Sequence, residues 1–168
     1  MVIFDTDILS MFAKAEALET LLAFFDSTRC GMTPAIADEI AVPLLYGYDF
    51  PTQILSRVQV MPIKQEIATK TVQFSLINAK LGRGEREAIA FCEVECASFI
   101  TNDAIARKFA QAQGVTVFSL QAMLRAFWES GFMPRSEVRT LLERIKRADA
   151  LEVSEQVEQE IFRDERSE

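Results

Sequence analysis

The chain has 168 residues, a formal net charge of −7 and no histidine. This length fits one domain with an ample core, and a hydrophobic content of 49% excludes a disordered chain. Without histidine, Ser–His and Cys–His catalysis and the usual zinc enzyme sites are excluded. The acidic balance argues against a wholly basic nucleic-acid-binding surface, although it leaves room for a local one.

The sequence predicts a cytoplasmic protein. No apolar run approaches the ~20 residues that span a bilayer, and the apolar start, which Asp5 and Asp7 interrupt, is too short for a signal peptide. Cys30, Cys92 and Cys96 lack metal-binding spacing, so we expect reduced thiols. Cys92 and Cys96 are four residues apart, and we expect both to pack in the core from one helical stripe.

Short apolar runs and helical patterns alternate along the chain. The runs that predict strands are 2–4, 29–32, 58–63, 97–101 and 115–118. The segments that predict helices are 8–13, 18–25, 34–42, 64–81, 85–92, 104–113, 120–128, 136–146 and 154–162, with a loop at 46–51. This alternation predicts an α/β fold, a three-layer α/β/α sandwich around a central parallel sheet with extra C-terminal helices.

We expect one principal domain over residues 1–130 and a helical extension of the same domain over 131–168, with a charged, frayed end from about Arg163. Helical spacing selects the side chains that should point inward. These are Ile67, Val72, Leu76 and Leu81 in 64–81, and Ile105 and Phe109 in 104–113.

Four carboxylates lie where strands end or helices begin. Asp5 ends the first strand, Glu39 lies in the helix after the second, Glu85 opens a buried helix, and Asp103 follows the strand ending at Thr101. The carboxyl ends of parallel strands share one edge, so Asp5 and Asp103 should face a common cleft. Repulsion there favours a divalent ion, and oxygen ligands suit Mg²⁺ or Mn²⁺. Such a site can support phosphodiester hydrolysis.

Each acid also has a purely structural explanation. Asp5 and Asp103 could cap the helices that follow them, Glu39 could lie on a helix surface, and Glu85 or Glu87 could complement a helix dipole. Glu85 and Glu87 lie about 200° apart around a helix, and periodicity does not choose between them. Asp7 could orient a neighbouring carboxylate or water, or simply be an acid in the first turn of a helix.

The residues resemble a PIN domain, the metal-dependent ribonuclease fold of VapC-type toxins. Four short motifs carry the resemblance, in order, from residue 1 to about 125. They are Phe4-Asp5-Thr6-Asp7-Ile8-Leu9, Thr33-Pro34-Ala35-Ile36-Ala37-Asp38-Glu39-Ile40, Gly84-Glu85-Arg86-Glu87-Ala88-Ile89-Ala90 and Ile100-Thr101-Asn102-Asp103.

The resemblance implies that Asp5, Glu39, Glu85 and Asp103 hold Mg²⁺ or Mn²⁺ and are the catalytic residues. Glu85 is preferred to Glu87 because its distance of 18 residues from Asp103 suits the family spacing better. Two positions depart from the family pattern. Asp7 stands where the family usually has Asn or Ser, and Glu85 stands where many members have Asp.

The resemblance also implies an endoribonuclease, the toxin of a toxin–antitoxin pair, with RNA as substrate, a protein antitoxin as partner and a homodimeric assembly. Basic side chains near the expected edge could contact RNA phosphates or form solvated helix surface: Arg83, Arg86, Arg107 and Lys108. The apolar face of Leu120, Leu124, Phe127 and Trp128 could pair two copies, although core packing is the simpler role.

Two other classes remain at this point. Asp-x-Asp after a first strand also opens haloacid-dehalogenase-like phosphatases, in which Asp5 would be the nucleophile and Asp7 a general acid. That family, however, has Gly-Thr or Thr-Val where Ile8-Leu9 stands here. The other class is a PIN-fold binding module without catalysis, against which the complete set of acids argues.

Overall fold

A computed structural model gives the structure of the chain and describes residues 1–163. Its centre is a five-stranded, wholly parallel sheet with the strand order β3-β2-β1-β4-β5. The strands are β1 (Val2–Phe4), β2 (Cys30–Met32), β3 (Gln59–Val60), β4 (Ser98–Ile100) and β5 (Val117–Phe118). The predicted α/β class with a central parallel sheet is confirmed.

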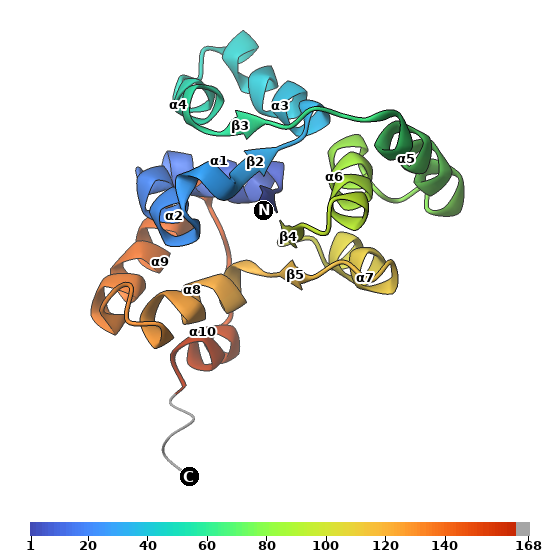
Figure 1. The fold of residues 1–168 in the computed structure, drawn as a ribbon. Helices are drawn as coiled ribbons and strands as arrows, with labels where there is room; N and C mark the ends of the chain where they lie inside the picture. The colour runs from blue at the N-terminus through green and yellow to red at the C-terminus, as the bar shows by residue number, and fades with distance from the viewer. Residues whose placement is uncertain (164–168) are drawn as a thin grey trace.

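Helices surround this sheet (Figure 1). Between β1 and β4 the chain forms α1 (Thr6–Lys14), α2 (Leu18–Phe25), α3 (Pro34–Ala41), α4 (Phe50–Arg57), α5 (Gln65–Ile77) and α6 (Arg83–Val94), with short 3₁₀ turns η1 (Ser27–Arg29) and η2 (Val42–Tyr46). After β4 come α7 (Ala104–Ala112), α8 (Leu120–Glu129), α9 (Arg135–Asp149) and α10 (Glu155–Phe162).

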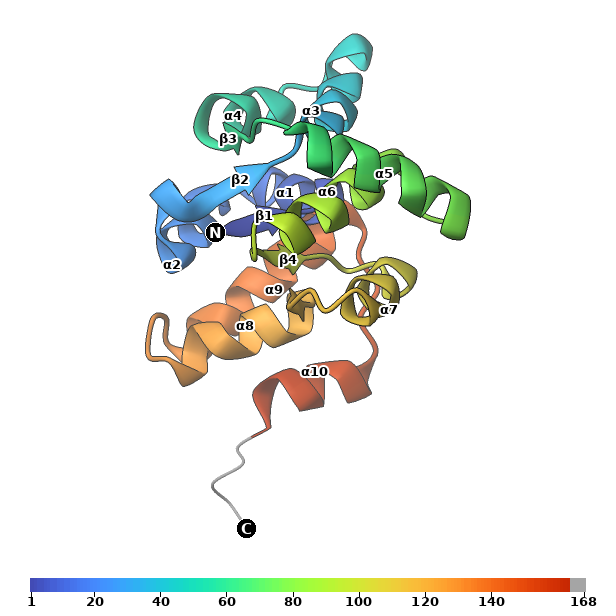
Figure 2. The ribbon, with the colours of Figure 1, turned by 45° about the vertical axis from the view of Figure 1, so that its right-hand side comes forward.

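The strand order fixes the layers. The chain runs from β1 through β2 to β3 towards one edge, and then crosses to β4 and β5 on the other side of β1. Right-handed crossovers in opposite directions place their helices on opposite faces of the sheet. Accordingly α1 packs with α4 and α9, while α5 packs with α6 (Figure 2). The two layers meet where α3 contacts α6, at the carboxyl edge of the sheet.

The core is one continuous apolar cluster built on the central strands. Ile3 and Phe4 of β1 are completely buried, as are Phe99 and Ile100 of β4. The phenylalanine ring of Phe127 joins α8 to this core. The predicted apolar face of residues 120–128 therefore packs inside the protein, which confirms the simpler of its two roles.

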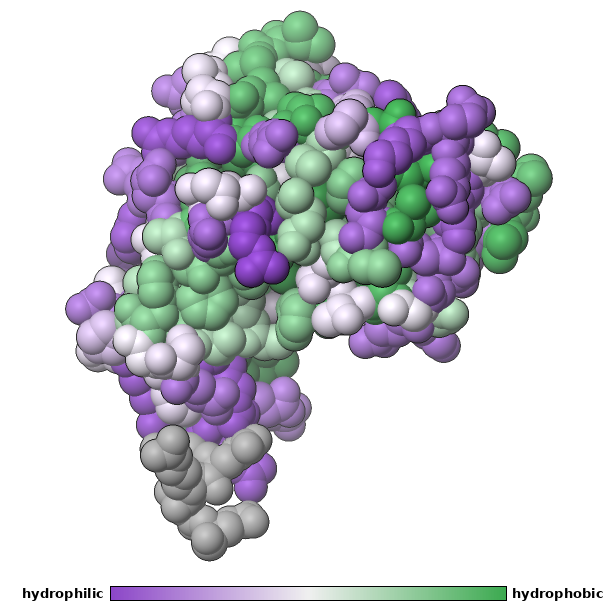
Figure 3. All heavy atoms as spheres, viewed as in Figure 1, coloured by the Kyte–Doolittle hydropathy of each residue, from purple (hydrophilic) through white to green (hydrophobic). Residues whose placement is uncertain are grey.

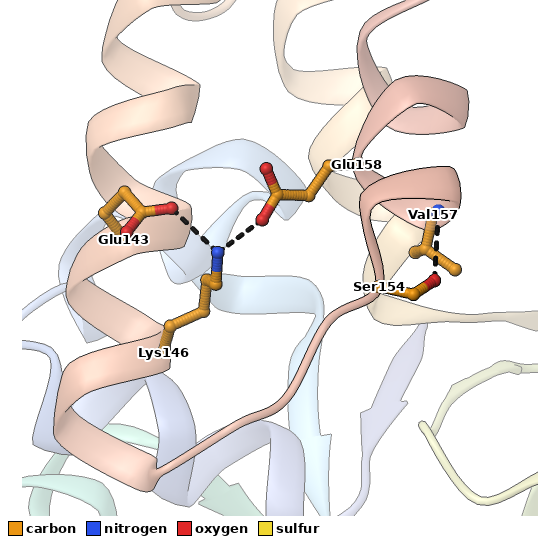
Figure 4. Close-up of polar contacts among 5 residues, drawn as sticks. All are labelled: Glu143, Lys146, Ser154, Val157 and Glu158. Atoms are coloured by element: carbon orange, nitrogen blue, oxygen red, sulfur yellow. Dashed lines mark hydrogen bonds and ion pairs between the residues drawn. The ribbon is translucent and has the colours of Figure 1, made fainter.

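The C-terminal helices cover one side of the same core. The face of α9 that carries Val138, Leu141, Leu142 and Ile145 is buried in the common cluster. α10 packs on α8, where Trp128 Nε1 donates to the carbonyl of Ile161 at 2.9 Å. Figure 4 shows how Lys146 of α9 binds Glu143 at 2.9 Å and also contacts Glu158 of α10.

Several element bounds differ from the prediction. α4 occupies residues 50–57. Its first two residues were expected to belong to the loop at 46–51, and residues 52–57 were given no structure. Its Pro51 lies in the first turn, where the missing N–H costs nothing, so this proline starts a helix rather than interrupting one. β3 is shorter than the predicted strand, and α5 ends at Ile77 instead of continuing to Leu81.

Four inward assignments are wrong. Val72 and Leu76 of α5 are exposed, with 61% and 83% of their surface accessible, and Ile105 of α7 is 46% exposed. The spacing was helical, but α5 is a peripheral helix that buries only Ile67 and Phe74. Cys96 is exposed beyond the end of α6, whereas Cys92 is buried as expected.

No helix within residues 1–163 has the length and apolar character needed to cross a bilayer. The predicted charged end lies outside the described residues from 164 onward. The division of the chain at residue 130, and the cytoplasmic location, remain predictions.

Candidate functional site

Asp5 lies at the centre of the candidate site. β1 ends at Phe4, and the backbone N–H of Asp5 continues the pairing by donating to the carbonyl of Ile100 at 2.9 Å. Asp5 caps α1 by accepting from the backbone N–H of Thr6 at 2.8 Å, and its other oxygen accepts from the Thr101 hydroxyl at 2.6 Å. The carboxylate therefore sits between β1 and β4, where the strand order reverses and ligands bind in such folds.

Burial makes the charge of Asp5 costly. Only 6% of the residue is exposed, and this desolvation raises the pKa of Asp5 to about 7. The hydrogen bonds from Thr101 and Thr6 oppose the rise, while the negative charge of Glu85 adds to it. A nearby cation would offset the remaining free-energy cost of ionising the buried Asp5 carboxylate.

Asp103 follows β4 and begins α7. One carboxylate oxygen accepts from the backbone N–H of Ala106 at 2.6 Å, so Asp103 has the capping role that the sequence allowed. Its own N–H donates to the Thr101 hydroxyl oxygen at 3.1 Å. The hydroxyl of Thr101 thus joins Asp5 to Asp103, and both acids lie at the common edge that the parallel sheet predicts.

Glu39 reaches this edge from α3. Its two carboxylate oxygens accept from the Thr6 hydroxyl at 2.7 Å and from the backbone N–H of Gly84 at 2.9 Å. The approach to Gly84 is close, because a Cβ at that position would lie 2.7 to 3.0 Å from the Glu39 carboxylate. A side chain at this position would therefore push the Glu39 carboxylate aside, and Gly84 itself lies in the first turn of α6.

The two glutamates of the third motif point to different places. Glu85 lies in the first turn of α6 and its carboxylate accepts from the backbone N–H of the N-cap residue Gly82 at 2.6 Å, which is the half of a capping box that a glycine N-cap allows. Burial raises the pKa of Glu85, and repulsion from Asp103 and Glu39 raises it further against the opposing Gly82 bond. Glu87 instead accepts from the backbone N–H of Ala35 at 2.7 Å. Glu85 therefore faces the other acids, and Glu87 faces the start of α3.

Asp7 adds a fifth negative charge at the rim. It lies at the surface in the first turn of α1. Partial loss of hydration raises the pKa of Asp7, as does repulsion from Asp149, and the positive charge of Lys14 acts in the opposite direction. Lys14 Nζ binds Asp149 Oδ1 at 2.5 Å, so the end of α9 borders the site.

The donor set suits a hard divalent cation. Among residues 1–163, no three carboxylates or cysteines are already arranged as a set of metal ligands. Asp103 Oδ2 and Glu85 Oε1 accept no hydrogen bond from the described residues. Mg²⁺ and Mn²⁺ are commonly held by a few carboxylate oxygens and several waters, so the residues present fit such an ion once these side chains turn towards it.

The sequence missed three contributors. Thr6 was noted only as part of the first motif, yet its hydroxyl donates to the Glu39 carboxylate. Gly84 was noted only as the first residue of the third motif, although its position directly before Glu85 gave a signal for close contact. Asp149 lies 142 residues beyond Asp7, and no sequence pattern links the two.

The fold and the site define an α/β protein whose acids gather at the carboxyl edge of a parallel sheet. The chain belongs to the family described as DUF3368, a PIN domain, whose model matches residues 1–166. PIN domains are generally nucleases, typically use divalent metal ions and act on nucleic acid. No curated protein and no solved structure matches the chain significantly.

Proposed function

We propose that the protein is a Mg²⁺- or Mn²⁺-dependent endoribonuclease in which Asp5, Glu39, Glu85 and Asp103 hold the metal and are the catalytic residues. The observation that carries the proposal is the buried Asp5 carboxylate, whose raised pKa shows a negative charge that the surrounding protein compensates only in part. Family membership supports the same conclusion, since PIN domains are generally nucleases.

The residues divide the work by their contacts. Thr101 holds Asp5 and Asp103 in register, while Thr6 and the N–H of Gly84 hold Glu39. A bound divalent ion would supply charge neutralisation at the scissile phosphate and a more acidic water. The Asp5 carboxylate, with a pKa of about 7 before the ion binds, would lose its proton when the ion arrives.

The decisive experiment compares cleavage of structured and unstructured RNAs in Mg²⁺, Mn²⁺ or chelator by the parent, Asp5→Asn and Asp103→Asn. We expect metal-dependent cleavage by the parent and a loss of at least 100-fold in both variants. Asp38→Asn is the matched control, because Asp38 adjoins Glu39 but is exposed and pairs with Arg83 at 2.9 Å. If both site variants cut as fast as the parent, the nuclease assignment is wrong.

The same assay decides between the alternatives. Release of inorganic phosphate from small phosphoesters would support the haloacid-dehalogenase-like phosphatase, which membership of the PIN family already disfavours. Binding of Mn²⁺ without cleavage of any RNA would support a non-catalytic module.

A toxin role with a protein antitoxin and a homodimeric assembly belongs to the same proposal. Apolar side chains exposed on α5 support a contact between copies: Val72, Leu76 and Ile77. In Figure 3 this region forms green surface at the right-hand edge.

Induced expression should arrest bacterial growth for the parent and not for Asp5→Asn. Light scattering should show a dimer that Leu76→Asp converts to a monomer.

A further inference from the structure

Helix α3 begins without a cap of its own. Thr33 occupies the N-cap position, but its side chain makes no capping hydrogen bond, and its buried Oγ1 has no partner among the described residues. The free N–H groups of a first helical turn need acceptors from elsewhere. Glu87 provides one from α6, because its Oε1 accepts from Ala35 N at 2.7 Å.

A second hydrogen bond runs in the opposite direction between the same two helices. Glu39 of α3 accepts from the N–H of Gly84 in the first turn of α6 at 2.9 Å. Each helix thus places a carboxylate on the positively polarised first turn of the other, an arrangement that the helix dipole favours. The two bonds fix where α3 lies relative to α6, and therefore where the Glu39 carboxylate lies.

We propose that Glu87 is a positioning residue that sets the place of Glu39, and that it is not a metal ligand. This inference rests on the proposed function, for which Glu39 is a ligand. It assigns separate tasks to the Gly-Glu-x-Glu motif. Gly84 leaves room for Glu39 and binds it, Glu85 faces the acids, and Glu87 clamps α3.

The first test compares Glu87→Ala with Glu87→Gln, since the glutamine carbonyl can still accept from Ala35 without carrying charge. We expect Glu87→Ala to weaken Mn²⁺ binding, measured by calorimetry, at least fivefold and to lower kcat at least tenfold. Glu87→Gln should stay within about twofold of the parent on both measures. A glutamine variant as defective as the alanine variant would show that the charge matters, which is the behaviour of a ligand.

Amide hydrogen exchange tests the clamp without reference to RNA. In Glu87→Ala, the amides of Ala35 and Gly84 should exchange at least tenfold faster, and Glu87→Gln should restore both. The matched control is Glu93→Ala. Glu93 lies on the same helix as Glu87, but its carboxylate binds Lys70 of α5, so its removal should leave the exchange of both amides unchanged. An unchanged Gly84 amide in Glu87→Ala would overturn the inference.

A double-mutant cycle shows whether Glu87 acts through Glu39. In a Glu39→Gln background, adding Glu87→Ala should change Mn²⁺ affinity less than twofold, and full additivity would refute the positioning role. Failure of the proposed function looks different. A parent that neither binds Mn²⁺ nor cuts RNA would refute the nuclease, while the exchange of the two amides would still decide whether Glu87 places α3.

Discussion

Replacing Asp5 with asparagine should stabilise the metal-free protein at neutral and alkaline pH. Burial raises the pKa of Asp5 from 3.8 to about 7, a shift of about three pKa units. Each unit corresponds to about 1.4 kcal/mol, so the ionised Asp5 lowers the free energy of unfolding by about 4 kcal/mol at pH 8. A carboxyl with a raised folded pKa carries no penalty below pH 4, and the penalty grows as the pH rises to about 7. Asparagine removes it but also weakens the bonds to Thr6 and Thr101, which leaves a net gain of about 2 kcal/mol.

The assay is urea unfolding of the parent and of Asp5→Asn in chelator from pH 4 to pH 8.5. The difference in unfolding free energy should grow with pH in favour of the variant, and saturating Mn²⁺ should reverse it. Asp26→Asn is a control of opposite sign. Hydrogen bonds from Thr28 lower the pKa of Asp26, so that variant should lose stability above about pH 4. A flat difference for Asp5→Asn across this range would refute the argument from burial.

Three further substitutions test other parts of the structure. Gly84→Ala puts a Cβ within 3.0 Å of the Glu39 carboxylate and should weaken Mn²⁺ binding at least tenfold by calorimetry, whereas an unchanged affinity would mean that Glu39 is not a ligand. Thr101→Val removes a buried hydroxyl that donates to Asp5. It should lower the free energy of urea unfolding by about 1–3 kcal/mol and lower kcat. Unchanged values of both would contradict the bridging role of Thr101. Phe127→Ala leaves a cavity beside Phe12 and should cost about 3–5 kcal/mol, and a loss under 1 kcal/mol would place this ring outside the core.

The strands and the edge acids could be predicted because they depend on local patterns. Short apolar runs ending at Asp5 or Asn102-Asp103 indicate strands. The geometry of a parallel sheet then places the carboxyl ends of these strands at one edge. Helical spacing was less informative for α5. Leu76 fits an apolar stripe, yet nothing in the described residues covers it, because spacing shows which side chains share a face and not whether a neighbour packs there.

The contact that Glu87 makes could not be predicted from the sequence, although the family spacing had favoured Glu85 over Glu87 as the site residue. It depends on the crossing of α3 and α6, which places Ala35 beside Glu87 although 52 residues separate them. The same holds for Thr6 and Glu39, which are 33 residues apart. Long-range hydrogen bonds of this kind follow from the strand order. That order cannot be inferred from the local patterns of a single sequence.

The placement of α9 has a consequence for synthesis of the protein. Arg144 donates to the carbonyls of Ala15 and Glu16, and Asp149 binds Lys14. The C-terminal end of α1 is therefore covered by a helix that is synthesised more than 100 residues later. A nascent chain stalled before residue 135 would leave this side of α1 open to water. The surroundings of α1 are therefore complete only after residues 135–149 of α9 have been made.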